Sequence, residues 1–236
     1  MAIILHLETA TPVCSVALAK DGQLLSLREI NGGYTHSENL TNFISQVCNE
    51  AGISLNQLDA IAVSAGPGSY TGLRIGASTA KGLCYAMQKP LIAIDTLKSL
   101  TACLIASEKF DPLTLFVPMI DARRMEVYYA VYNQALDEIN PPDAMVIDTS
   151  SFSALTSERS IVLFGDGSSK CKSVLGDRKK IKFSDVTLSA SGMIKLSQDK
   201  FLRNAFENVS LFEPFYLKEA AIGKVVKLNT RNTFNA

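Results

Sequence analysis

The sequence predicts an α/β protein with a ribonuclease H-like order of three strands, a helix, a strand, a helix and a strand. Short apolar runs separated by turn residues predict the strands, and helical spacing of apolar residues begins only after the third run. Helices join the later strands, as parallel neighbours in one sheet require. Of the 236 residues, 47% are apolar and 19% are charged. This composition is typical of a globular protein.

The first three strands are expected at residues 3–7, 15–20 and 24–30. Lys20-Asp21-Gly22-Gln23 separates the second from the third, and an Asp-Gly pair between apolar runs signals a hairpin. At least two of these strands are therefore expected to be antiparallel.

Apolar residues at helical spacing predict the first helix, which we expect to end at Gly52. These residues are Leu40, Phe43, Ile44, Val47 and Ala51. Thr35 and Glu38 are placed to form a capping box at the start of the helix.

The remaining elements divide the chain into two halves. The first half is completed by a strand at 60–64, a glycine-rich turn, a long helix at about 71–87 and a strand at 91–94. The second half repeats the fold in degenerate form, with a helix at 96–107, strands at 113–120, 127–132 and 161–164, a loop at 140–143 and a turn at 165–167. We expect an N-terminal lobe over 1–95, a C-terminal lobe over 96–220 and a mobile tail over 221–236.

Charge and cysteine usage narrow the class of function. Lys plus Arg and Asp plus Glu are balanced at 23 each, which gives no long-range field to attract nucleic acid or an anionic membrane. The five cysteines have no CxxC spacing, as expected in a reducing compartment. The first apolar stretch is too short for a membrane span and lacks the basic flank of a signal peptide. We expect a soluble, cytoplasmic protein with no membrane partner.

The most distinctive segment is the glycine-rich stretch GPGSYTGLRIG at residues 66–76, between a predicted strand and a helix. Such a turn can expose backbone N–H groups at a helix N-terminus and bind an anion. Its glycines can equally serve tight turns and close helix packing. It is not a Walker loop, because Leu73 and Arg74 occupy the positions that require Lys and Ser or Thr. The residues alone leave both roles open.

Several segments together resemble the TsaB family. They are GPGSYTGLRIG with the following AKGL and KPLI, LETATPVCSVAL at the start, THSENL before the first helix, DARRMEVYYAVY in the second half and EPFYLKEA near the end. The resemblance implies the two-lobed, actin-like ATPase (ASKHA) fold. It also implies a role in making threonylcarbamoyladenosine beside the anticodon of tRNAs.

The resemblance further implies a set of partners. A TsaD-like catalytic subunit would bind this chain, a TsaE-like ATPase would join the assembly, and tRNA would reach the chain only through that complex. Alone, the chain would form a homodimer. Its role would be that of a non-catalytic dimerisation or scaffold subunit.

In the TsaD-like paralogue two histidines spaced HxxxH are metal ligands. The corresponding positions here are Thr96 and Leu100, and neither side chain can replace a histidine ligand. The chain has only two histidines, His6 and His36, and we expect His36 at the surface or at the helix entry rather than in catalysis. The sequence therefore predicts no metal ligand and no catalytic residue.

A degenerate nucleotide site remains a candidate. The first strand ends in Glu8-Thr9, where nucleotide-binding relatives have an aspartate for Mg²⁺, an ion that demands strict octahedral geometry. Gly165-Asp166-Gly167 resembles the second glycine turn of the family, where active relatives contact nucleotide. No cofactor is expected to be required, and ATP or ADP is expected to bind only weakly. The candidate site comprises Glu8, Thr9, Gly66, Gly68, Asp121, Gly165 and Gly167.

An alternative of another class is an independent ATPase or glycoprotease-like metallohydrolase that uses Glu8, Asp121 and the two glycine turns. The absent HxxxH pair argues against it, and no Ser/His/Asp or Cys/His arrangement supports protease chemistry. Asp121 and the arginines after it, Arg123 and Arg124, are expected to form an ion pair that fixes a turn. The basic residues at 178–182 are expected on a solvated surface loop.

The helix at about 71–87 is apolar on two sides. A helix that covers one sheet needs an apolar arc of about 100°, and this helix has nearly twice that, so its second face needs another neighbour. We expect this helix and the first one to pack against the equivalent pair of the paralogue, or of a second copy, as a four-helix bundle. The predicted partner-binding residues are Leu40, Ile44, Gly72, Arg74, Ile75, Ser78, Thr79, Gly82 and Ala86.

Overall fold

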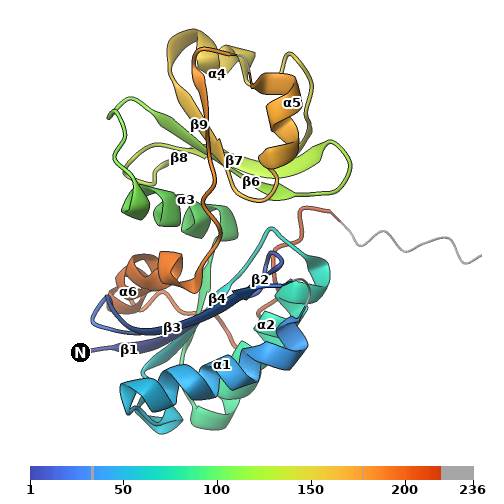
Figure 1. The fold of residues 1–236 in the computed structure, drawn as a ribbon. Coiled ribbons are helices and arrows are strands. Elements are labelled where there is room, and N and C mark those ends of the chain that lie inside the picture. Colours follow the sequence, from blue (N-terminus) through green and yellow to red (C-terminus); the bar gives the residue numbers. More distant parts are fainter. Residues whose placement is uncertain (33–34, 177, 219–236) are drawn as a thin grey trace, which may run out of the picture.

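The computed structural model describes residues 1–32, 35–176 and 178–218. These residues form two lobes, each built on a five-stranded sheet (Figure 1). The tail expected over 221–236 lies outside the described residues.

The elements alternate between the two sheets and the helices that cover them. The first part of the chain forms β1 (Ile3–Glu8), β2 (Val13–Lys20), β3 (Gln23–Asn31), α1 (His36–Ala51), η1 (Leu55–Gln57), β4 (Ala60–Ser64), α2 (Tyr70–Met87) and β5 (Leu91–Ile94). The middle forms α3 (Thr96–Ser107), β6 (Leu115–Asp121), β7 (Glu126–Tyr132), β8 (Glu138–Val146), α4 (Ser153–Glu158), β9 (Ile161–Phe164), η2 (Ser169–Cys171), α5 (Lys172–Leu175) and β10 (Ile181–Ser184). The last part forms η3 (Ala190–Met193) and α6 (Ile194–Leu202).

The first sheet has the strand order β3-β2-β1-β4-β5. Its first three strands are antiparallel neighbours, whereas β4 and β5 run parallel to β1. The hairpin between β2 and β3 turns at Asp21 and Gly22, both with positive φ, and α1 is terminated by Gly52 in the left-handed region. The predicted ribonuclease H-like order, the hairpin and the end of α1 are confirmed.

The second sheet repeats this topology in the order β10-β9-β6-β7-β8. Here β6, β7 and β8 are antiparallel neighbours, and β9 and β10 run parallel to β6. The helices that follow the strands are much reduced, since α4 has 6 residues and α5 has 4, against 16 in α1 and 18 in α2. The two-lobed fold with a degenerate second lobe is confirmed, and the degeneracy lies in its helices.

Three expectations about local structure are wrong. Residues 140–143 belong to β8 rather than to a loop, because an edge strand with register shifts tolerates its two prolines. The surface loop expected at 178–182 runs into β10, which places Lys182 in a strand. Thr35 has a φ of −94° and a ψ of 19°, and its side chain forms no cap, so the predicted capping box is absent at α1.

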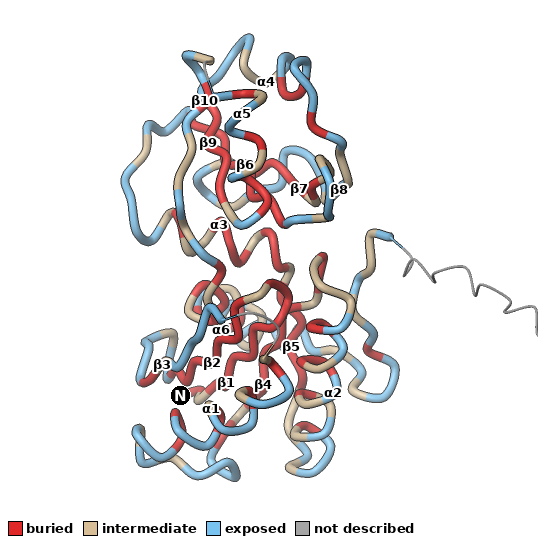
Figure 2. Tube along the Cα trace, turned by 45° about the vertical axis from the view of Figure 1, so that its right-hand side comes forward, coloured by how far each residue is buried: buried red, intermediate tan, exposed pale blue. Residues whose placement is uncertain are grey.

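The sheets and helices form successive layers (Figures 1 and 2). The helices α1 and α2 cover one face of the first sheet, and η3 with α6 covers the other face. The helix α3 packs on β6 and η3 between the lobes, and α4 and α5 cover the outer face of the second sheet. Ala10 and Leu73 of the first lobe belong to the α3 cluster, so the lobes share apolar packing.

After β10 the chain returns to the first lobe. Ala190 and Met193 pack on the first sheet, and the Phe215 N–H donates to the Ala65 carbonyl oxygen at 2.6 Å. Phe212 joins the core beneath α1 and α2. The division of the chain at residue 95 remains a prediction, but the segment from Ala190 to Phe215 is physically part of the first lobe.

Candidate functional site

The glycine-rich turn before α2 packs directly against the loop that follows β1. A Cβ atom on Gly72 would lie 2.1 Å from the Thr9 carbonyl oxygen, and one on Gly68 would lie 2.5 Å from the Ala10 carbonyl oxygen. The Thr9 hydroxyl donates back to the Gly72 carbonyl oxygen at 2.8 Å. Only glycine permits this approach, and the space in front of the turn is filled by backbone.

Three backbone donors in and directly after this turn are used within the chain. The Ser69 N–H donates to the Ala10 carbonyl oxygen at 2.7 Å, and the Gly66 N–H donates to the Thr96 hydroxyl at 3.0 Å. The Ser69 side chain caps α2 by accepting from the Gly72 N–H. Of the two roles that the sequence left open, the structure supports close packing.

Glu8 lies at the end of β1 and is completely buried. One carboxyl oxygen accepts from the Ala10 N–H at 2.7 Å, while Oε2 has no hydrogen-bond partner among the described residues. Burial raises the pKa of Glu8 to about 7, and hydrogen bonds from Ala10 and Ser64 oppose the shift. The group is therefore a buried carboxyl rather than an open metal ligand.

The two positions that correspond to the HxxxH ligands are packed in the interior. Thr96 is fully buried with its hydroxyl engaged by Gly66, and Leu100 is 1% exposed within the cluster between the lobes. No group of three or more His, Cys, Asp and Glu side chains suited to a metal occurs within the described part of the chain.

Both histidines are structural. His6 is fully buried, with Nε2 2.7 Å from the Ser197 hydroxyl of α6 and Nδ1 3.2 Å from the Ala17 carbonyl oxygen. Burial lowers its pKa to about 4. His36 is the first residue of α1 and is 1% exposed, so its expected helix-entry position is confirmed and its expected surface position is wrong.

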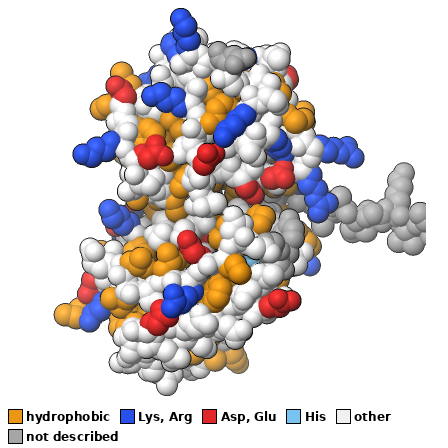
Figure 3. Space-filling view, in the orientation of Figure 1, with side chains coloured by type: hydrophobic (Ala, Val, Ile, Leu, Met, Phe, Trp, Pro, Cys, Tyr) orange, Lys and Arg blue, Asp and Glu red, His pale blue; other side chains and the backbone are white. Residues whose placement is uncertain are grey.

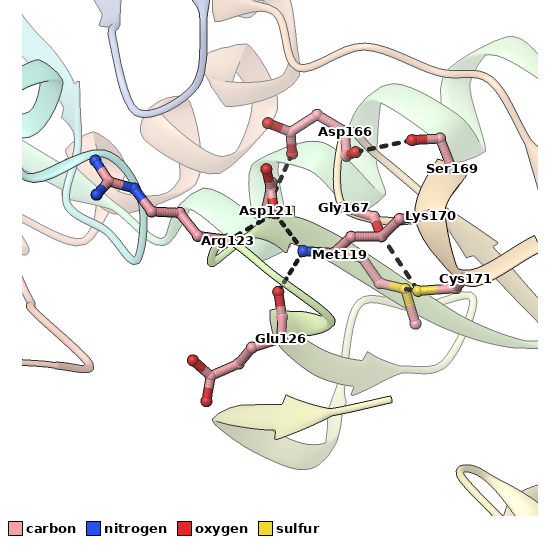
Figure 4. Close-up of polar contacts among 9 residues, drawn as sticks. All are labelled: Met119, Asp121, Arg123, Glu126, Asp166, Gly167, Ser169, Lys170 and Cys171. Atoms are coloured by element: carbon pink, nitrogen blue, oxygen red, sulfur yellow. Dashed lines mark hydrogen bonds and ion pairs between the residues drawn. The ribbon is translucent and has the colours of Figure 1, made fainter. Parts of the chain in front are cut away.

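The second glycine turn packs against β6 in the same way as the first turn packs after β1. A Cβ atom on Gly165 would lie 2.4 Å from the Met119 carbonyl oxygen. The intervening Asp166 accepts from the Asp121 N–H at 3.2 Å, and burial raises its pKa to about 6 (Figure 4). Gly167 is equally restricted, with a Cβ position 2.8 Å from Ile120.

The expected ion pair between Asp121 and the arginines that follow it is absent from the structure. The Asp121 carboxylate instead pairs with Lys170 and accepts from the Arg123 backbone N–H at 2.9 Å (Figure 4). Sequence reasoning missed Lys170, because only the fold brings it to the end of β6. Lys170 also donates to the Glu126 carbonyl oxygen and so ties the hairpin together.

A small cavity lies between the lobes, and of the predicted nucleotide-site residues only Gly165 lines it. It has a volume of about 60 Å³ and is lined by residues from the loop after β1 and the second glycine turn, among them Thr11, Val13, Gly165 and Asp166. Ligand pockets are typically about 300–1,000 Å³. This conformation therefore has no room for a nucleotide in that cavity.

The predicted partner-binding residues separate into two groups. Leu40 and Ile44 are 1% and 4% exposed, and Gly72 is buried, so these three residues belong to the core of the lobe and cannot form its surface. The other six lie along the outward side of α2. Arg74, Ser78, Gly82 and Ala86 are exposed, and Ile75 and Thr79 are half-buried.

A family model described as TsaD, tRNA N6-adenosine threonylcarbamoyltransferase, matches residues 32–226. The chain belongs to this family. Its relatives place it among the TsaB, or YeaZ, members.

The TsaB-type chain is similar to several bacterial proteins named tRNA threonylcarbamoyladenosine biosynthesis protein TsaB. It is 38% identical to that of Haemophilus influenzae over 127 residues, which cover 54% of this chain and 52% of the relative. It is 27% identical to that of Bacillus subtilis over 177 residues, which cover 74% and 75%. The chain spans about half the length of the H. influenzae relative and 55% of the Escherichia coli one.

Solved structures share the fold of the TsaB-type chain. YeaZ from Pseudomonas aeruginosa superposes with a TM-score of 0.77 at 24% identity, covering 92% of this chain and 100% of that one. A second structure from that organism, described as an uncharacterized protein with similarity to peptidase YEAZ, has a TM-score of 0.78 at 24% identity and the same coverage.

Proposed function

We propose that this TsaB-type chain is a non-catalytic subunit that enables threonylcarbamoyl transfer to the adenosine beside the anticodon of tRNA. The observation that carries the proposal is the burial of Thr96 and Leu100 at the positions where a TsaD-like subunit has its metal ligands. Catalysis then resides in that TsaD-like subunit, to which this chain binds. The names of the TsaB relatives support the pathway.

The outward side of α2 is the proposed contact with the partner. Gly82 lies inside the helix, is exposed, and would place a Cβ atom with nothing within 4 Å. A glycine inside a helix costs about 1 kcal/mol relative to alanine, and nothing in the free chain requires one here. A second helix that approaches closely would require it. The polar outward side of α1, with Thr41, Asn42 and Ser45 exposed, would complete the surface.

The wider assembly follows the same proposal. A TsaE-like ATPase joins the complex, tRNA binds to the assembled complex, and the chain alone forms a homodimer through the same helices in the cytoplasm. No cofactor is required, and any ATP or ADP binds weakly, in keeping with the 60 Å³ cavity. Across the described ranges, no helix is long and apolar enough to cross a membrane.

Two experiments test the proposal. Affinity capture of the chain from its native lysate, followed by mass spectrometry, should recover TsaD-like and TsaE-like subunits. Depletion of the chain should lower threonylcarbamoyladenosine in bulk tRNA, measured by nucleoside mass spectrometry. Unchanged modification in the depleted strain would sink the proposed function.

A further inference from the structure

The turn between β6 and β7 holds two arginines in an unfavourable backbone conformation. Arg123 and Arg124 have φ angles of 70° and 50°. This region is sparsely populated by residues other than glycine, asparagine and aspartate, and hairpins that need it usually contain Asn-Gly or Asp-Gly. Residues held in such conformations cluster at functional sites. The backbone conformation of this turn therefore indicates a functional role for its two arginines.

The charges of these arginines are not neutralised within the structure. Both side chains are exposed, and neither guanidinium forms a hydrogen bond or ion pair with another residue that the structure describes. Figure 4 shows the Arg123 side chain extended away from the Asp121 network. The nearby carboxylates already have lysine partners, in the pairs Lys170–Asp121 and Lys218–Glu126.

Tyr128 and Tyr216 pack against the apolar cluster where the two lobes meet. Tyr216 packs against Tyr70, with ring centroids 4.8 Å apart and the ring planes tilted by 46°, and thus joins the end of the described chain to the start of α2. The Arg74 guanidinium lies over the Tyr70 ring, 4.0 Å from its centroid. Tyr128 lies two residues after Glu126 on β7, and Lys218 pairs with Glu126, so Lys218 lies on the same face of this strand as Tyr128. Arg123 lies in the turn that immediately precedes β7. All three tyrosines are half-buried. Figure 3 shows Lys and Arg side chains at this edge of the molecule.

We propose that this strip of aromatic rings and cations contacts single-stranded RNA directly. The strip consists of Tyr70, Tyr128, Tyr216, Arg123, Arg124 and Lys218. Arginine binds phosphate through a planar fork, and aromatic rings stack on unpaired bases. The combination of rings and cations matches a single strand, whereas an acidic protein surface would match the cations alone. Because basic and acidic residues balance at 23 each, the contact is local.

The inference rests on the proposed function and deepens it. The adenosine beside the anticodon lies in a loop of unpaired nucleotides, which presents both phosphates and base faces. Within the assembly, the chain would therefore supply a direct contact to the tRNA, in addition to its contact with the catalytic subunit.

The test is fluorescence anisotropy of the full chain with a labelled anticodon stem-loop RNA and with a fully paired duplex of equal length. Wild type should prefer the stem-loop. Arg123→Gln combined with Arg124→Gln should weaken its binding about tenfold and flatten the log–log salt dependence by about 1.4. Tyr216→Leu, which keeps an apolar side chain, should weaken it about fivefold. The matched control, Lys179→Gln with Lys180→Gln, removes the same charge at exposed residues of the second lobe and should bind like wild type.

Several outcomes would overturn the inference. Undetectable stem-loop binding by wild type at low salt would do so, as would equal losses in the arginine and lysine double variants. If the arginine variant keeps its RNA affinity but no longer captures the TsaD-like subunit, the strip is a protein interface. These outcomes can be distinguished from a failure of the proposed function, which would appear as unchanged tRNA modification after depletion of the chain.

Discussion

At Glu8 the environment of the side chain, rather than its residue type, sets its chemistry. The carboxyl is fully buried, only one of its oxygens has a hydrogen-bond partner among the described residues, and its pKa is raised to about 7. The buried His6 is shifted in the opposite direction, to a pKa of about 4. In both cases burial penalises the charged form.

The first residue-level prediction concerns Glu8→Gln. The folded pKa of about 7 exceeds the ordinary value of 4.5, so the Glu8 contribution is fully present below pH 4.5 and is lost as pH rises through 7. The loss amounts to about 3 kcal/mol. The variant should lack this loss and unfold at higher urea than wild type at pH 8, with little difference at pH 4.5. Parallel pH profiles of the two proteins would refute the raised pKa.

The second residue-level prediction concerns the left-handed arginines. Replacing Arg123 and Arg124 by glycine removes unfavourable side-chain contacts at positive φ and should stabilise the chain by about 1 kcal/mol in total. Thermal unfolding followed by circular dichroism measures the change. The control is glycine at the exposed Lys179 and Lys180, which lie outside the positive-φ positions and should not gain stability. A lower melting temperature for the arginine variant would contradict the strained turn.

Some helices and strands can be predicted from the sequence, and others cannot. The long helices, the first hairpin and the strands with continuous apolar runs are predictable from periodicity and turn residues. β8 is not, because Pro141 and Pro142 indicate a loop and only its place at the sheet edge makes them acceptable. The role of the first glycine turn was undecidable, because it depends on the Thr9 and Ala10 backbone lying opposite, which local sequence does not reveal.

Because the two sides of α2 differ in burial, two arginine substitutions in this helix are expected to have different effects. Ala80 is fully buried against the sheet, so Ala80→Arg should prevent folding, since an unpaired charge in a core is strongly destabilising. Ile75 is half-buried on the outward side, so Ile75→Arg should give a folded monomer that no longer binds the TsaD-like subunit. Circular dichroism and light scattering measure the two outcomes. If both variants stay folded and dimeric, α2 is not the interface.

In the molecule as a whole, both sheets have the same topology, but the space between the lobes is nearly filled. Both glycine turns pack against neighbouring backbone, and the cavity between the loop after β1 and the second glycine turn has a volume of only about 60 Å³. The sequence indicated the loss of metal ligands at Thr96 and Leu100. The packing that fills the space between the lobes could not be predicted from the sequence, because it depends on contacts between segments that are distant along the chain.

The prediction at this scale is that the purified chain carries no stoichiometric zinc or iron and shows no steady ATP turnover. The reason is that Thr96 and Leu100 are packed in the interior and Glu8 is buried. Elemental analysis and a coupled ATPase assay measure both properties. A stoichiometric metal, or turnover that Glu8→Ala abolishes, would contradict the prediction, whereas weak ATP binding without turnover would not.

The return of the chain to its first lobe has a consequence for synthesis on the ribosome. Within the described part of the chain, the face of the first sheet that includes Ile4 and Ile92 is covered by η3 and α6, which begin at Ala190. At 5–20 residues per second, the roughly 100 residues between β5 and η3 take about 5–20 s to emerge. The second lobe, which is continuous in sequence, can fold during that interval. The first lobe is thus completed after the second one, and it presents an apolar sheet face to chaperones until residues 190–202 have emerged.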